Sequence, residues 1–194
     1  ALKMKVRKPM TLPELVKATG KPADELEPLL QQMAVVGLLE YNWENPRREK
    51  QYILPMFVPG SAEFFNMNKQ QIADHPEVTA FFERMTFLPL ERITAMVPPG
   101  GAGIGMHVIP VEKAIETENH SLDIEHISHW LKKYEDHLGV GYCSCRNAMR
   151  LQGQGCGELQ DEMCIAVGQF CDYCLETGKG RKITYEEAME ILQR

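Results

Sequence analysis

The chain has 194 residues, of which 44% are hydrophobic and 25% charged, and its formal net charge is −6. This composition is typical of a folded globular protein and excludes a disordered chain. No apolar run reaches the roughly 18–20 residues of a membrane span, and the basic start lacks the apolar core of a signal peptide. The chain does not begin with Met and stops at Arg194 within a predicted helix, so we expect a piece of a longer polypeptide.

Residues 1–57 are predicted to form an N-terminal winged-helix-like domain. Thr11 and Glu14 form a capping box that opens a helix ending at Gly20, and a second helix follows from about residue 22 to Gly37. Two strands, 38–43 and 51–54, complete a hairpin. Helix, turn, helix and hairpin is the order of a winged helix-turn-helix.

The charge of the second helix argues against DNA binding. It carries Asp24, Glu25 and Glu27 and no Lys or Arg between residues 22 and 36, so phosphates would repel it. Basic groups on the wing could touch a DNA backbone, but they are few: Arg47, Arg48 and Lys50. The pattern favours a module for protein contact or a structural cap, with a DNA-binding regulator as the alternative.

Residues 58–121 are expected to connect the two ends of the chain. The pattern predicts short helices at 61–68 and 76–85 and a hairpin of 88–97 with 106–111. The glycine-rich stretch 100–105 could cradle a phosphate, but it opens no clear helix, and a flexible hairpin loop is the favoured interpretation.

Residues 122–194 are expected to form a helical, cysteine-rich domain. An apolar stripe predicts a helix over 122–138, a second helix is predicted over 158–175, and Thr184 opens a final helix. His126 and His129 lie off the stripe, which favours solvated histidines over a metal site. The expected fold class is therefore mainly α with a small β component (α+β).

All six cysteines fall within one 32-residue window, and residues 1–142 contain none. They are Cys143, Cys145, Cys156, Cys164, Cys171 and Cys174. Such clustering in a chain without a signal peptide indicates a metal or cluster site in a reducing compartment, which implies the cytoplasm, rather than disulfides. Thiolates are soft ligands that select zinc or an iron–sulfur cluster, and the spacing fits the usual paired zinc ligands poorly.

Neighbouring residues favour a cluster over zinc and over buried free thiols. Gly153, Gly155 and Gly157 would let backbone N–H groups approach cluster sulfurs, and Arg146 and Arg150 could offset negative charge. On the predicted helix, three later cysteines would share one face: Cys164, Cys171 and Cys174.

Several segments resemble a family of anaerobe ferredoxin-like 4Fe–4S binding proteins with an N-terminal helix-turn-helix-like domain. They are YCSCR at 142–146, GC at 155–156, Cys164, ETGKGRKITYEEA at 176–188, VPG at 58–60, EF at 63–64 and VIPV at 108–111. Further cysteine-rich segments usually follow in that family, which agrees with the expectation of a fragment.

The resemblance implies a redox role beside flavin-dependent oxidoreductases, in a larger complex. It implies an electron-transfer component of an oxidoreductase rather than a stand-alone enzyme, with a redox protein as partner. By position, the family pattern assigns the 4Fe–4S cluster to Cys143, Cys145, Cys156 and Cys164. Cys171 and Cys174 do not match and are left as spare thiols, alternative ligands or a second site. A zinc-stabilised structural subunit and a winged-helix regulator with a cysteine sensor stay open as alternatives.

Overall fold

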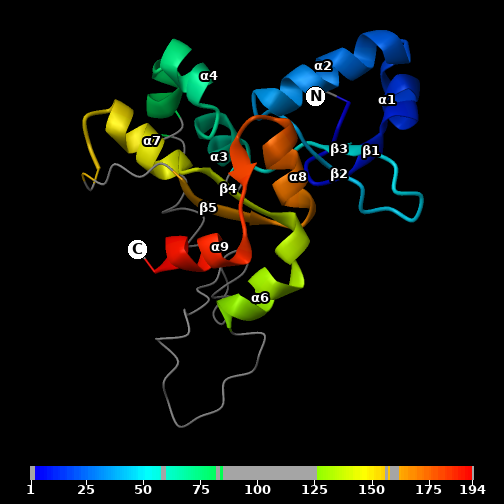
Figure 1. Ribbon diagram of the computed structural model, residues 1–194. Coiled ribbons are helices and arrows are strands. Elements are labelled where there is room, and N and C mark those ends of the chain that lie inside the picture. Colours follow the sequence, from blue (N-terminus) through cyan, green and yellow to red (C-terminus); the bar gives the residue numbers. More distant parts are fainter. Residues whose placement is uncertain are drawn as a thin grey trace, which may run out of the picture.

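The computed structural model describes residues 3–57, 60–81, 84, 126–155, 157 and 162–193. Within them the chain has a mixed α+β fold with two three-stranded sheets (Figure 1). The expected hairpin of 88–97 with 106–111, the glycine-rich stretch 100–105 and Cys156 lie outside the described residues.

The first sheet and two helices form what we call the N-terminal unit, residues 3–57. Its elements are β1 (Met10–Thr11), α1 (Leu12–Thr19), α2 (Ala23–Val35), β2 (Glu40–Asn42) and β3 (Gln51–Ile53). The strands are antiparallel in the order β1-β3-β2. Both predicted helices and the predicted hairpin are confirmed, while β1, which pairs Met10 with Tyr52, was not predicted.

Local signals set the ends of these helices as expected. The Thr11 N–H donates to the Glu14 carboxylate at 2.8 Å, and Gly20 ends α1 with a φ of 73°. Gly37 follows α2 with a φ of 88°, and a Cβ at this position would lie 2.7 Å from the backbone of Phe64. The chain after α2 is therefore pressed against the next helix, and only glycine fits there.

Two short helices follow the N-terminal unit, α3 (Ser61–Asn66) and α4 (Lys69–Asp74), and residues 77–81 are also helical. The predicted helix 61–68 is thus confirmed in its first six residues. Asn68 caps α4 by accepting a hydrogen bond from the Gln71 N–H at 3.1 Å. Its side-chain amide also donates to the carbonyl of Val35, at the end of α2, at 3.1 Å.

The second sheet lies at the centre of what we call the cysteine unit, residues 126–193. Its elements are α6 (Ile127–Lys133), the 3-10 helix η3 (Glu135–His137), β4 (Leu138–Tyr142), α7 (Ser144–Leu151), β5 (Glu162–Val167), α8 (Gln169–Glu176), β6 (Gly180–Lys182) and α9 (Tyr185–Leu192). The strand order is β5-β4-β6, and both pairings are antiparallel. The cysteine domain, which the sequence predicted to be helical, therefore has helices around a three-stranded sheet.

Two predicted helices are corrected by these strands. Leu138 fits the apolar stripe of the helix expected over 122–138, but α6 ends at Lys133 and Leu138 begins β4. Within the described part of the helix expected over 158–175, residues 162–167 form the strand β5, and α8 begins at Gln169. A short apolar run such as 163–167 fits a buried strand as well as a helix, so periodicity alone could not separate the two.

Two clusters of buried side chains hold the described residues together. One joins α1, α2, the first sheet and α3 to α8, and it contains Leu15, Leu30, Tyr41, Phe64 and Tyr173. The other packs α6 and α9 against the second sheet around Leu131, Leu138, Val140, Ala188 and Ile191. The N-terminal unit therefore shares a core with helix α8 of the cysteine unit, as the position of α8 in Figure 1 shows.

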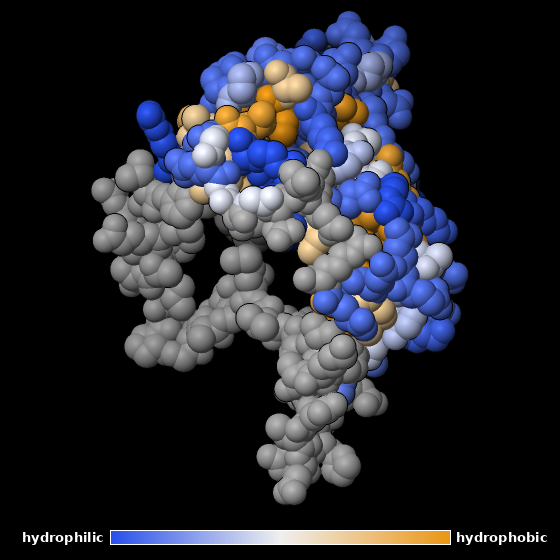
Figure 2. All heavy atoms as spheres, turned by 60° about the vertical axis from the view of Figure 1, so that its left-hand side comes forward, coloured by the Kyte–Doolittle hydropathy of each residue, from blue (hydrophilic) through white to orange (hydrophobic). Residues whose placement is uncertain are grey.

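The described surface offers no sign of a membrane-spanning segment. None of the described helices combines the length and hydrophobicity that crossing a bilayer requires. On the side where α7 and α4 lie, the surface is mostly hydrophilic, with hydrophobic areas among the polar ones (Figure 2). The large hydrophobic residues that are exposed come from separate elements, among them Leu29, Phe81 and Leu151, which is ordinary for a globular surface.

Candidate thiol site

Three of the predicted ligands come from one strand–turn–helix corner and the strand beside it. Cys143 follows β4 and is the N-cap residue of α7, and Cys145 lies in the first turn of that helix. Cys164 lies on β5, where it pairs with Gly141 of β4. The antiparallel register therefore brings Cys164 to the end of β4, next to Cys143. We call Cys143, Cys145 and Cys164 the thiol site.

Hydrogen bonds between the sulfur atoms centre on Cys143. The thiols of Cys145 and Cys164 both donate to Cys143, and this holds the pKa of Cys143 well below its ordinary value. The same hydrogen bonds to Cys143, together with burial, raise the pKa values of Cys145 and Cys164. Removing protons from these thiols together would place like charges side by side, which is the situation that a bound cation relieves.

The N-terminus of α7 adds backbone donors to the site. The Arg146 N–H donates to the sulfur of Cys143 at 3.4 Å, and the Ser144 N–H donates to the sulfur of Cys164. Thiolates are favoured at such a position because the helix dipole and the exposed N–H groups carry partial positive charge. The Arg146 side chain lowers the pKa of Cys143 further, as expected from the sequence, whereas Arg150 lies in the last turn of α7.

Helix α3 forms a neighbouring wall that the sequence did not predict. Asn147 of α7 donates to the backbone carbonyl of Asn66 at 3.3 Å, and both side chains are buried. The carboxylate of Glu63, one turn earlier on α3, contributes to the raised pKa of Cys145. These residues lie about 80 positions from the cysteines, and no spacing rule in the sequence connects them.

The described residues do not by themselves form a complete metal-binding site. No three His, Cys, Asp or Glu side chains among them are grouped so that they could hold a metal ion. The thiols instead meet in pairs through Cys143. The fourth predicted ligand, Cys156, lies outside the described residues, and the sequence places it between α7 and β5, the two elements that carry Cys145 and Cys164.

The donor set nevertheless fits a thiophilic metal or cluster. Three adjacent soft sulfur donors and two backbone N–H groups aimed at them are the groups that such a centre uses. The three glycines predicted to let backbone N–H groups approach cluster sulfurs, Gly153, Gly155 and Gly157, have φ values of 70°, 118° and 82°. Only glycine adopts these conformations readily, so the α7–β5 connection depends on them.

Cys171 and Cys174 lie elsewhere, in the core beneath the N-terminal unit. Both side chains are almost completely buried, with 1% and 2% exposure, and they pack within the cluster that joins α2 to α8. Burial raises the pKa of both thiols, that of Cys174 to about 12. The expectation that Cys164 shares a helical face with them is wrong, because Cys164 is on a strand. We call Cys171 and Cys174 the buried pair.

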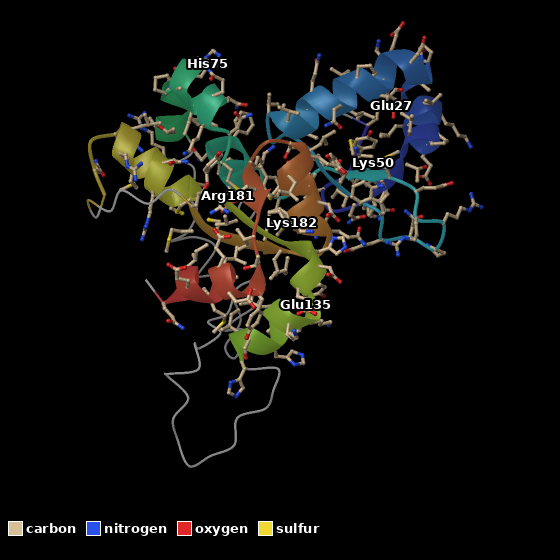
Figure 3. All side chains as sticks on the ribbon, in the orientation of Figure 1. Glu27, Lys50, His75, Glu135, Arg181 and Lys182 are labelled. Atoms are coloured by element: carbon tan, nitrogen blue, oxygen red, sulfur yellow. The ribbon has the colours of Figure 1, made fainter. Side chains whose placement is uncertain are left out.

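The other predicted site residues are on the surface or serve packing. His129 is exposed on α6, in contact with the Trp130 ring, and His126 lies at the start of this helix. On the wing, Arg47 forms an ion pair with Glu49. Lys50 lies 3.7 Å from the centre of the Tyr41 ring, so its ammonium group serves an internal contact (Figure 3).

A groove of about 690 Å³ separates the wing from the start of α8, away from the cysteines of the thiol site. Three aromatic side chains line it, Trp43, Tyr134 and Phe170. Its charged side chains already have partners in part: His137 contacts Asp172 at 3.1 Å, and Glu176 accepts a hydrogen bond from the Tyr41 hydroxyl at 2.7 Å.

Comparison with known proteins adds no relative: no family model, no curated protein and no solved structure matches the chain.

Proposed function

We propose that Cys143, Cys145, Cys156 and Cys164 hold an iron–sulfur cluster of the 4Fe–4S type, and that the chain is an electron-transfer component of an oxidoreductase. The observation that carries this proposal is the meeting of three cysteines at the N-terminus of α7, where Cys143 accepts hydrogen bonds from the other two. Clusters of this type require four soft sulfur ligands, and Cys156 is the fourth thiol expected by position.

The surrounding groups support a redox role. When bound, an iron–sulfur cluster supplies one-electron transfer, and its potential depends on hydrogen bonds to sulfur, on burial and on nearby charge. The Ser144 and Arg146 N–H groups would donate to the ligand sulfurs, and the Arg146 guanidinium would offset negative charge. Cys145 is exposed at the edge of the site, which gives a redox partner an approach.

The N-terminal unit is proposed to be a winged-helix-like module that docks a redox protein, a flavin-dependent oxidoreductase being the partner class implied by the resemblance. The order of α1, α2 and the β2–β3 hairpin supports this proposal. The exposed carboxylates of α2, on Asp24, Glu25 and Glu27, would repel phosphates and thus disfavour DNA.

Anaerobic quantitation of iron, acid-labile sulfide and zinc on the purified chain tests the proposed function. We expect about four iron and four sulfide per chain for a 4Fe–4S centre, with broad visible absorbance that dithionite bleaches. A colourless protein with about one zinc per chain would overturn the cluster and support a structural zinc site. A Cys156→Ser variant then tests the fourth ligand, because it should lose most of the iron; retention of all the iron would overturn this assignment.

A further inference from the structure

Lys179 is a buried cation that caps a helix of the other unit. Its side chain has 0% exposure, and its ammonium group donates to the carbonyl oxygens of Ala34 and Val35 at 2.9 and 2.8 Å. These carbonyls belong to the last turn of α2, which has no basic residue of its own there. A helix leaves its last carbonyls without partners and carries partial negative charge at this end, so a cation from the turn after α8 satisfies both needs.

The main chain of the same residue is fixed to the strand that leads into the thiol site. The Tyr142 N–H donates to the carbonyl of Lys179 at 3.1 Å, and Tyr142 directly precedes Cys143. The Lys179 N–H in turn donates to the carbonyl of Cys174 at 2.8 Å. A Cβ on Gly180 would lie 2.4 Å from the carbonyl oxygen of Val140, so the turn lies in close contact with β4.

Tyr173 strengthens the same contact with α2. Its hydroxyl lies 3.1 Å from the carbonyl oxygen of Ala34 and 2.9 Å from that of Leu39, and its ring centre lies 5.0 Å from the Lys179 ammonium. The end of α2 is therefore held by two buried polar side chains, both from the α8–β6 segment. Figure 1 shows the end of α2 above this segment.

We infer that Lys179 couples the occupation of the thiol site to the docking of α2, so that the N-terminal unit responds to the state of the cysteines. The inference rests on the proposed function, because it requires a centre bound at the corner between β4 and α7. A bound centre would restrain this corner and with it Tyr142, whose N–H holds the main chain of Lys179, and the side chain of Lys179 holds α2. Coupling of this kind is reciprocal, so a partner that holds the N-terminal unit would strengthen binding at the thiol site.

The buried charge of Lys179 makes its contact with α2 sensitive to changes elsewhere in the structure. Burial lowers the pKa of Lys179 to about 8, with the Cys174 thiol as the titratable group that acts against this shift. A charged ammonium in this position therefore costs free energy even with two carbonyl partners. This desolvation cost is recovered when the contact opens, so opening is a local event that changes at the β4 corner can shift.

Hydrogen exchange on the full chain, with and without the reconstituted iron–sulfur centre, tests the coupling. In the wild-type protein we expect loading to slow exchange in residues 33–41 by about fivefold. In Lys179→Met, which keeps the apolar stem, loading should still produce visible absorbance but leave exchange in 33–41 unchanged. Lys182→Met is the matched control on β6, where the side chain is exposed, and it should respond like the wild type.

The outcomes separate this inference from the proposed function. A wild-type protein that takes up no iron removes the proposed function, and absorbance reports this before any exchange is measured. A loaded wild type with unchanged exchange in 33–41, or a Lys179→Met variant that responds fully, overturns the coupling alone. Should Lys179→Met not fold, Lys179→Gln, which loses the charge and shortens the side chain, replaces it: the coupling predicts a response below the wild-type fivefold, and a full response overturns it.

Discussion

The two groups of thiols in the described chain have opposite surroundings. The thiol site lies at a helix N-terminus, with one exposed sulfur, two half-buried sulfurs and hydrogen bonds that centre on Cys143. The buried pair, Cys171 and Cys174, lies on the inner face of α8 and packs against the N-terminal unit. Cys171 and Cys174 follow Cys164 by only 7 and 10 positions, yet one group has the surroundings of ligands and the other those of core side chains.

The difference shows that burial and partners, rather than residue type, decide what a cysteine can do. Cys143, which accepts hydrogen bonds from two thiols and from a backbone N–H, has a lowered pKa and so favours the thiolate that binds a soft metal. A thiol surrounded by apolar side chains keeps its proton and behaves as a small hydrophobic residue. The five described cysteines therefore fall into two sets that separate experiments can address.

The largest effect is expected from replacing one cysteine of each set. Cys143→Ser should reduce bound iron after anaerobic reconstitution by more than about tenfold, because a hydroxyl is a poor substitute for the thiolate that the other two thiols share. Cys174→Ala should keep the wild-type iron content, because its sulfur lies in the core. Equal iron loss in both variants, with circular dichroism showing both folded, would contradict the separation of the two sets.

Alkylation of the metal-free protein should separate the same two sets by rate. Among the described thiols, iodoacetamide should modify Cys143 first, because it is only half-buried and its lowered pKa keeps it a thiolate, the form that reacts. Cys171 and Cys174 should react at least about 100-fold more slowly because α8 must open before reagent reaches them. Peptide mass spectrometry after timed quenching gives the rates. Reconstitution should protect Cys143 and leave the slow rates unchanged; rapid labelling of the buried pair in the folded protein would refute its burial.

Part of this arrangement was predictable from the sequence. The capping box at Thr11, the N-cap at Thr184 and the glycines that follow α1 and α2 identify helix ends, because they act locally. The grouping of Cys143 with Cys145 follows from their spacing. The second sheet was not predicted, because Gly139 and Gly141 interrupt the β4 pattern and the apolar run of β5 also fits a helix.

The features that the sequence did not predict depend on packing between residues far apart in the chain. Gly139 is required because a Cβ there would lie 2.9 Å from the sulfur of Cys171, a contact between residues 32 positions apart that no local pattern announces. Lys179 gave no signal either, since lysines are normally exposed and its partners lie about 145 positions earlier. Burial of the pair on α8 depends on the N-terminal unit covering it, which is a property of the whole chain.

The titration of Cys174 gives a smaller effect, which appears in the free energy of unfolding rather than in iron content. Burial raises its pKa to about 12 from an ordinary value of 9.0. Between these values the unfolded chain has lost the proton that the folded chain keeps, so the unfolded state binds fewer protons and stability falls as pH rises. The wild type should lose about 1.4 kcal/mol per pH unit relative to Cys174→Ala from pH 9 upward.

Urea unfolding of the metal-free proteins at pH 8, 9.5 and 10.5 measures this difference. Lys179, Tyr173 and the thiol site are present in both proteins, so most of their own pH dependence cancels in the comparison. Parallel stability curves for the wild type and Cys174→Ala above pH 9 would show that the Cys174 sulfur is in contact with water.

The smallest effect concerns the packing of Cys171 against the second sheet. Gly139→Ala would place a methyl group 2.9 Å from the sulfur of Cys171 and 3.2 Å from the carbonyl oxygen of Arg181. Overpacking of this kind costs about 1–3 kcal/mol of unfolding free energy. Combined with Cys171→Ala, which removes the sulfur, the cost of Gly139→Ala should fall by about 1 kcal/mol, because only the contact with Arg181 remains. Additive free energies in this double-mutant cycle would mean that the sulfur does not pack on β4, and the buried pair would then need another explanation than core packing.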